Sequence, residues 1–437
     1  MREMKNSGVE WIGQIPKGWE LRRAKTLFTQ RNSKGNGIEV LLSPTQKYGV
    51  VPQSQLEGVV QVKEDTDLQM FKTVHKGDFV ISLRSFQGGF EYSLYEGVCS
   101  PAYQVFYPTS PICDTYYRYL FKSQSFISKM NNLTVGIREG KNIQYVDFAN
   151  SQIPVPPLAE QERIAVFLNA ECAEIDAVLE KTRASIEEYK KLKQAIITQA
   201  VTKGIRGDRP MKDRGIEWIG EIPAEWSVVK QKYFWNTIES GVSVNAADKP
   251  VDNSEQYGVL KTSAVSKFMF IPTEHKQVNL EEYGRVSCPV RADSIIASRM
   301  NTPELVGACG YVQNNYPNLF LPDRLWQITF KDELSPKYAW YYLSGIRVRQ
   351  YISSLSTGTS SSMQNISQSQ YGNIFITIPS IGEQSEIAKY LDEKCNSVDA
   401  LIAKKQQYLT EIENYKKSLI YEYVTGKKEV KTSVLAD

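Results

Sequence analysis

The sequence has few residues of the kinds that bind metals. It contains only two histidines, His75 and His275, and its six cysteines are scattered without a Cys-x-x-Cys pair. A structural zinc site needs clustered ligands, so a zinc site is not indicated. No apolar run approaches the roughly 20 residues that a membrane-spanning helix needs, and the polar residues 1–8 do not resemble a secretory signal. We expect a cytoplasmic protein with no membrane segment and no metal, and with both histidines on the solvated surface.

Motifs for catalysis are also lacking. The chain has no glycine-rich dinucleotide loop, no GxxxxGK[ST] phosphate loop and no Asn-Pro-Pro-Tyr or Asp-Pro-Pro-Tyr run for methylating the amino group of a base. Glu139 and Lys141 form an isolated Glu-x-Lys without a partnered upstream aspartate, so a nuclease is not indicated. The formal net charge is only +3, and any DNA binding would therefore depend on local basic patches.

The most prominent feature present is a long helical stretch that occurs twice, at about residues 158–203 and 381–426. One constant shift in numbering places Glu160–Gln161 on Glu383–Gln384. In both copies apolar residues recur at alternating steps of three and four, which is the coiled-coil pattern. Each copy predicts a helix of about 44 residues, roughly 66 Å long. The residues expected to pair the two helices are Leu168, Cys172, Ile175, Leu179, Ile186, Leu391, Cys395, Val398, Ile402 and Leu409.

A shorter motif, here named the tryptophan motif, also occurs twice. Its copies, Met4–Trp19 and Met211–Trp226, are identical at ten of sixteen positions, among them two tryptophans, a glycine and a proline. This pattern fits aromatic rings that pack across a Gly–Pro turn. We expect the motif to be a structural start to each domain, without a chemical role.

Two regions of similar length, about 20–155 and 227–378, separate each tryptophan motif from the helix that follows it. Each has short β-like runs with turn residues between them and one aromatic helical stretch, at 115–131 and at 336–355. The predicted fold class is α+β, with one mixed α/β fold used twice. The predicted segments are 1–157 for the first domain, 158–204 for the first spacer helix, 205–379 for the second domain, 380–427 for the second spacer helix and 428–437 for a C-terminal tail.

The order of these segments determines how the helices can pair. The first helix carries the chain from the first domain to the second, and the second helix carries it back. If they pair, they must be antiparallel, with a domain at each end and pseudo-two-fold symmetry. Such an internal repeat suits a target that has two different parts at a fixed separation.

Each domain has loops suited to reading DNA. Residues 82–89 and 298–302 occupy equivalent places, and 136–144 matches 358–366 through a shared Asn–Ile. Arg, Gln and Asn are the side chains that hydrogen-bond to base edges, although ordinary solvated turns are the alternative for any one residue. The predicted DNA-binding residues are Arg84, Ser85, Gln87, Arg138, Lys141, Asn142, Gln144, Arg299, Asn301, Ser360, Ser361, Gln364 and Asn365.

The whole chain resembles the specificity subunit of type I restriction–modification systems. The resemblance depends on the two helix beginnings, Ile153–Gln161 and Ile376–Gln384, on the helix ends at 195–204 and 418–426, and on Gly97–Tyr103 in the first domain. It implies two target-recognition domains, each reading one half of a bipartite, asymmetric site in double-stranded DNA.

The resemblance also implies the partners. The paired helices would set the spacer and dock two modification subunits, which bring S-adenosylmethionine and methylate adenine; up to two restriction subunits, using ATP and Mg²⁺, would join them to cut DNA. The chain itself would bind no cofactor and would not be an enzyme. The second domain departs from the family pattern at Arg291–Asp293 and lacks the Gln-Gly-Gly of the first, and the poor similarity of the domains predicts two different half-sites. The alternative is a protein-interaction scaffold that does not bind DNA.

Overall fold

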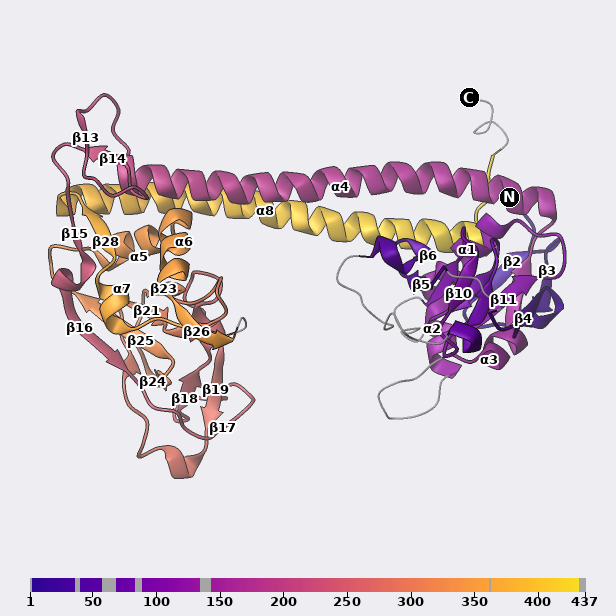
Figure 1. Ribbon diagram of the computed structural model, residues 1–437, viewed down its shortest axis with the longest axis horizontal. Helices are drawn as coiled ribbons and strands as arrows, with labels where there is room; N and C mark the ends of the chain where they lie inside the picture. The colour runs from indigo at the N-terminus through magenta and orange to yellow at the C-terminus, as the bar shows by residue number, and fades with distance from the viewer. Residues whose placement is uncertain are drawn as a thin grey trace. The chain divides into compact units, whose positions relative to one another are not determined.

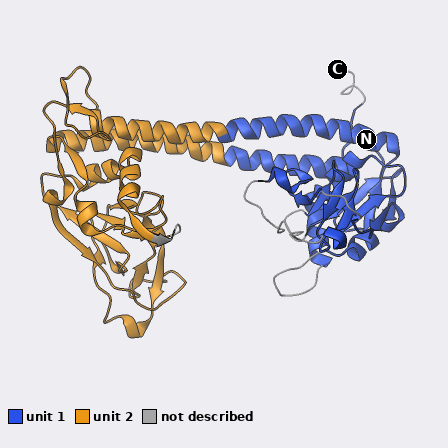
Figure 2. Cartoon of the chain, in the orientation of Figure 1, with its two compact units in different colours: residues 1–183, 407–437 blue, residues 184–406 orange. Residues whose placement is uncertain are grey.

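The computed structural model describes residues 2–35, 40–56, 68–82, 89–133, 143–360 and 363–431. The chain divides into two compact units (Figure 2): unit 1 comprises residues 1–183 and 407–437, and unit 2 comprises residues 184–406. The two long helices are α4 (Leu158–Lys203) and α8 (Ile381–Val424), and each unit contains a part of both (Figure 1). Both helices are continuous over these ranges, as the repeated apolar stripe predicts.

Within each unit the two helices are antiparallel. The ion pairs between them join rising residue numbers on α4 to falling numbers on α8, which confirms the predicted direction of pairing. These ion pairs, each at 2.6 Å, are Asp176–Lys416 and Arg183–Glu413 in unit 1 and Lys193–Asp399 in unit 2.

Unit 1 contains the first mixed α/β domain. Its largest sheet has the strand order β4-β11-β8-β9, with all neighbours antiparallel. The stacked rings of Phe79 and Phe106, 5.3 Å apart, lie in its core. The described strands are β1 (Met4–Asn6), β2 (Gln14–Pro16), β3 (Glu20–Arg23), β4 (Phe28–Arg31), β5 (Leu42–Thr45), β6 (Gly49–Pro52), β7 (Lys72–Val74), β8 (Phe79–Ile81), β9 (Phe90–Tyr92), β10 (Gly97–Cys99), β11 (Gln104–Pro108) and β12 (Gln152–Val155), and the helices are α1 (Asp114–Lys122), α2 (Gln124–Leu133) and α3 (Tyr145–Asn150).

Unit 2 contains the second domain, built on a matching sheet of order β16-β25-β21-β23 and a further five-stranded sheet of order β17-β19-β18-β24-β20. Its strands are β13 (Met211–Asp213), β14 (Glu221–Pro223), β15 (Ser227–Lys230), β16 (Trp235–Ser240), β17 (Ala246–Ala247), β18 (Gly258–Leu260), β19 (His275–Val278), β20 (Pro289–Val290), β21 (Ser294–Ser298), β22 (Met300–Asn301), β23 (Cys309–Val312), β24 (Tyr316–Phe320), β25 (Leu325–Phe330), β26 (Thr357–Ser360), β27 (Met363–Asn365) and β28 (Phe375–Ile378), and its helices are α5 (Pro336–Ser344), α6 (Ile346–Leu355) and α7 (Gln368–Gly372). The two domains therefore share the predicted mixed α/β fold.

Each predicted aromatic helical stretch is broken into two helices. Ser123 separates α1 from α2, and Gly345 separates α5 from α6; both residues have an extended backbone with ψ of 138°. An extended residue interrupts the ladder of hydrogen bonds that a single helix requires. The prediction of one helix over each stretch was wrong, and the break occurs at the same place in both domains.

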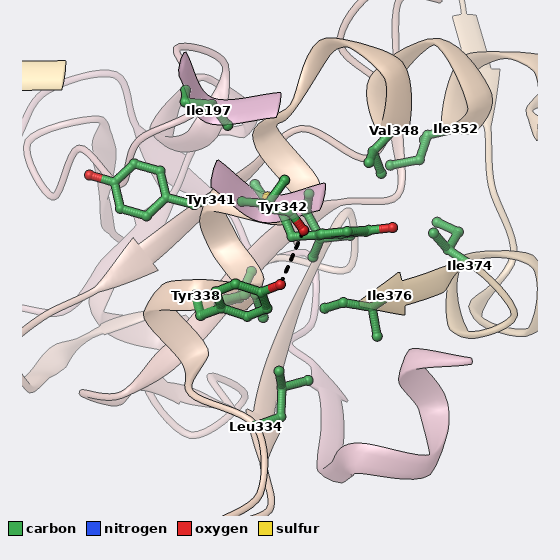
Figure 3. Packing of buried hydrophobic residues seen from close by; sticks show 14 of the residues in the cluster. Ile197, Leu334, Tyr338, Tyr341, Tyr342, Val348, Ile352, Ile374 and Ile376 are labelled. Carbon is green, nitrogen blue, oxygen red and sulfur yellow. Dashed lines mark hydrogen bonds between the residues drawn. The ribbon is translucent and has the colours of Figure 1, made fainter. Parts of the chain in front are cut away.

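Each domain packs against the end of one long helix and the beginning of the other. Tyr116 in α1 donates a hydrogen bond from its hydroxyl to the Val424 carbonyl at the end of α8, at 2.7 Å. In unit 2, the hydroxyl of Tyr338 donates to the Val201 carbonyl near the end of α4, at 3.3 Å. Figure 3 shows Tyr338 among the buried residues of unit 2, a cluster that also includes Ile197 of α4. The long helices are thus part of the core of both units.

Candidate nucleic-acid interface

In the second domain the two predicted reading loops meet in one small sheet. Strand β22 pairs with β27, and β27 pairs with β26. Asn301 lies opposite Gln364 in this sheet, and the Ile366 amide donates to the Arg299 carbonyl at 3.0 Å. Residues that are about sixty positions apart in the sequence therefore lie side by side in one sheet.

The polar side chains of this sheet differ in how they are held. The Asn301 side-chain oxygen accepts the amide of Thr302 at 2.9 Å, and the side-chain oxygen of Asn365 is buried without a partner among the described residues. Arg299 is partly exposed, and its backbone amide donates to the Arg324 carbonyl at 3.0 Å. Within the described ranges the Arg299 guanidinium is in no hydrogen bond or ion pair. Among the described predicted residues of this sheet, Arg299 is the positively charged one, and it is partly exposed.

In the first domain, the described residues include only those on either side of the predicted reading loops. The Ser82 amide donates to the Gly89 carbonyl at 2.7 Å, where the chain passes from β8 to β9. At the second loop, Ile143 is 1% exposed, as is its counterpart Ile366, and Gln144 is exposed at the start of α3. The predicted residues Arg84, Ser85, Gln87, Arg138, Lys141, Asn142 and Ser361 lie outside the described residues, as does the side chain of Ser360.

The residues predicted to pair the long helices lie mainly in the interior. Ile402 is the one that is half-buried. The others are at most 9% exposed: Leu168, Cys172, Ile175, Leu179, Ile186, Leu391, Cys395, Val398 and Leu409.

The tryptophan motifs contact the long helices through a carboxylate that sequence reasoning did not connect with them. The Trp19 indole donates to Glu160 at 2.9 Å, and Arg2 pairs with the same carboxylate at 2.5 Å. In unit 2, Trp226 and Arg209 contact Glu383 in the same way, at 2.9 and 2.5 Å. The repeated tryptophans and the repeated glutamates were both visible in the sequence, but their pairing was not.

The environment of Glu383 favours its charged form. Burial acts to raise the pKa of Glu383, but the hydrogen bonds from Arg209 and Trp226 outweigh it and lower that pKa below its ordinary value. A charged carboxylate in the first turn of a helix is also favoured by the helix dipole. The motif therefore fixes the start of α8 in unit 2, which supports a structural role.

The prediction of a solvated surface histidine was wrong for His275, which is buried. Its Nε2 accepts the Val251 amide at 3.0 Å, and its Nδ1 lies 2.7 Å from the Pro272 carbonyl. Both ring nitrogens therefore have backbone partners, which is why a histidine can be buried here. His75 is partly exposed.

Metal clusters and membrane-spanning helices are both lacking in the described residues. No group of three or more His, Cys, Asp or Glu residues in those ranges could hold a metal ion. None of the helices in the described part of the chain combines the length and the apolar character needed to cross a membrane.

The family model for the type I restriction modification DNA specificity domain matches residues 16–188 and 223–414. The chain belongs to this family. The two matches coincide with the internal repeat and confirm the resemblance seen in the sequence. They show that the chain carries this DNA specificity domain twice, once on each repeat.

Several specificity subunits are similar to this chain. The putative MjaX specificity subunit of Methanocaldococcus jannaschii is 26% identical over 96% of this chain and 96% of its own length. The MjaVIII subunit of the same organism is 28% identical over 67% of this chain, and the EcoKI subunit of Escherichia coli is 23% identical over 73%. The match spans 66% of each of these last two subunits, just under two thirds.

A solved structure shares the fold. It comes from work on complex assembly and conformational transition of the type I R-M system, and it matches 95% of this chain and 99% of its own chain with a TM-score of 0.68 at 17% sequence identity. This similarity shows that the chain shares its fold with that structure over most of its length.

Proposed function

We propose that this chain gives a type I restriction–modification complex its DNA specificity, with each domain reading one half of a bipartite, asymmetric site. The observation that carries the proposal is the double match to the DNA specificity domain, one match on each repeat. The small sheet formed by β22, β26 and β27 supports it, because two polar loops join there with Arg299 beside them. Arginine is well suited to bidentate contact with guanine.

The long helices have two proposed roles in the complex. They set the number of unread base pairs between the half-sites, and they dock two modification subunits. Their continuity over Leu158–Lys203 and Ile381–Val424 supports the first role, because an uninterrupted helix has a fixed rise per residue. The second role rests on the match to the type I restriction modification DNA specificity domain.

The chemistry of the complex is proposed to belong to the partners. The modification subunits would bind S-adenosylmethionine and methylate adenine, and up to two restriction subunits would use ATP and Mg²⁺ to cut DNA. The lack of a base-methylation motif and of a phosphate loop in the sequence supports a non-catalytic role for this chain.

The proposal can be tested by mapping methylated adenines in DNA from cells that carry the modification subunits with and without this chain. We expect a bipartite methylated motif that depends on the chain. Arg299→Ala should weaken discrimination at one half-site by about 1–3 kcal/mol if Arg299 reads a base, and Arg84→Ala should do the same at the other. Arg347→Ala, at an exposed arginine on α6, is the control and should leave the motif unchanged.

Two results would count against this assignment. A methylation pattern that does not depend on the chain would favour the scaffold alternative. A loss of binding from Arg299→Ala that is the same for all sequences would make Arg299 a phosphate contact instead of a base contact.

A further inference from the structure

Unit 1 contains a cleft of about 320 Å³ that sequence reasoning did not indicate. The turn before β6, strand β9, helix α1 and both long helices line it. Its walls carry the cations Lys47, Arg118, Lys122 and Lys416 together with Tyr48 and the carboxylate of Glu91. Five separate elements thus converge on one hollow within a single unit.

The residues that line the cleft include more cations than carboxylates. Its one carboxylate, Glu91, is 1% exposed and is paired with Lys122 at 2.5 Å. Lys416 pairs with Asp176, which does not line the cleft. Lys47 and Arg118 have no ion-pair partner within the described ranges. Two cations are therefore left to attract an anion.

An aromatic ring lies beside each of these two cations. The Lys47 ammonium lies 4.9 Å from the centre of the Tyr48 ring, and the Arg118 guanidinium lies 5.0 Å from that of Tyr92. The Tyr92 hydroxyl donates to Asp114 at 2.9 Å, which fixes its ring. A cation held over a ring keeps its charge and its hydrogen-bond donors, so Arg118 is oriented without being neutralised. Lys47 lies beside the Tyr48 ring, which is 60% exposed.

The second domain shows that the fold does not require this cleft. Tyr116 and Tyr338 are equivalent because each donates to a carbonyl near the end of a long helix. Counting from them, Arg118 corresponds to Trp340, and Lys122 corresponds to Ser344. The Trp340 indole donates to the Phe268 carbonyl at 2.9 Å. The same place is therefore aromatic in one domain and cationic in the other.

We propose that the cleft of unit 1 binds a backbone phosphate of DNA, with Arg118 and Lys47 as its direct contacts. A guanidinium offers paired donors to phosphate oxygens, and a lysine adds a point charge. Lys122 and Lys416 line the same cleft but are paired with Glu91 and Asp176. The inference rests on the proposed function, because it assigns to this domain a contact that positions DNA without reading its sequence.

The test uses the complete complex of the chain with its modification subunits, and DNA that contains the mapped site or lacks it. The double variant Lys47→Ala/Arg118→Ala should bind both DNAs about three- to tenfold more weakly near 100 mM salt. The slope of log affinity against log salt should become shallower by about one for each phosphate that the variant no longer neutralises. The ratio between the two DNAs should stay the same.

Two further variants separate this inference from other causes. Arg118→Lys should bind more tightly than the double variant, because it keeps the charge. Lys25→Ala removes an exposed cation elsewhere in unit 1 and should leave affinity close to that of the unchanged complex. Thermal melting of each variant shows whether the fold is kept.

Four results would overturn the inference. They are unchanged binding by the double variant, an equal loss with Lys25→Ala, a changed ratio between the two DNAs, and weakened binding of modification subunits with normal DNA binding by the complex that remains. The last would make the cleft a protein-docking site. If the unchanged complex binds the mapped site no better than other DNA, the proposed function itself fails, and this inference fails with it.

Discussion

At the scale of single residues, Glu91 should make the stability of unit 1 depend on pH. Burial raises the pKa of Glu91 from 4.5 to about 7, and Lys122 only partly opposes this. Between those two pH values the unfolded chain has released the proton while the folded chain still holds it. The free energy of unfolding should therefore fall as pH rises from about 4.5 to about 7, by roughly 2–3 kcal/mol, and then level off.

Glu91→Gln should remove this part of the pH dependence. Denaturant unfolding of the variant and of the unchanged chain, measured from pH 4.5 to 8, gives the difference that is due to Glu91. Glu96→Gln is the matched control, because the Glu96 side chain is 70% exposed. Parallel stability curves for the Glu91 variant and the unchanged chain would show that the carboxyl titrates normally.

The sequence identified repeated residues but not their partners. Trp19 and Glu160 are 141 positions apart, and no local pattern links positions so distant. Gln161 is another example, because its side chain accepts the Cys113 amide at 3.0 Å, as that of Gln384 accepts the Ser335 amide at 2.8 Å. The repeated Glu–Gln pair marks a place where each domain holds its helix, which only the folded chain shows.

At the scale of elements, the buried seam should contribute much of the stability of the helix pair. Leu168 and Leu391 are both 0% exposed. Truncating either to alanine should lower the free energy of unfolding by about 2–5 kcal/mol, because less apolar surface is buried and a cavity is left. Leu401→Ala is the control, since Leu401 is 43% exposed on α8. Equal effects of the buried and exposed changes, measured by denaturant unfolding, would contradict this account.

Long elements were easier to predict than short ones. A long apolar stripe at helical spacing predicts a continuous helix, and both α4 and α8 are continuous helices over the predicted stretches. The helical stretches 115–131 and 336–355 each contain a residue that disfavours a helix interior, Ser123 and Gly345, and each stretch breaks at that residue. The cationic cleft could not be predicted from the sequence either, because its walls come from five separate elements.

At the scale of the whole molecule, the helices should control the spacer independently of the half-sites. Deleting one heptad from each helix at facing positions, residues 176–182 and 412–418, keeps the seam in register. It removes about 10 Å of helix, so the spacer should shorten by at most about three base pairs. Mapping of methylated adenines should show both half-sites unchanged. A changed half-site in the double deletion would contradict this division of roles. So would a single deletion, made in one helix only, that gave the same shortened motif.

Unit 1 is discontinuous in the sequence, and this affects how the protein forms during translation. Its first 183 residues leave the ribosome early, but residues 407 onward, which complete it, emerge only after all of unit 2. At about 5–20 residues per second, the wait is roughly ten seconds or more. Gly426 lies against Pro16 and Trp19, so this apolar surface stays uncovered until α8 has been made. The domain made first is the one completed last, and a nascent chain stopped before α8 holds an open hydrophobic surface for chaperones and proteases to recognise.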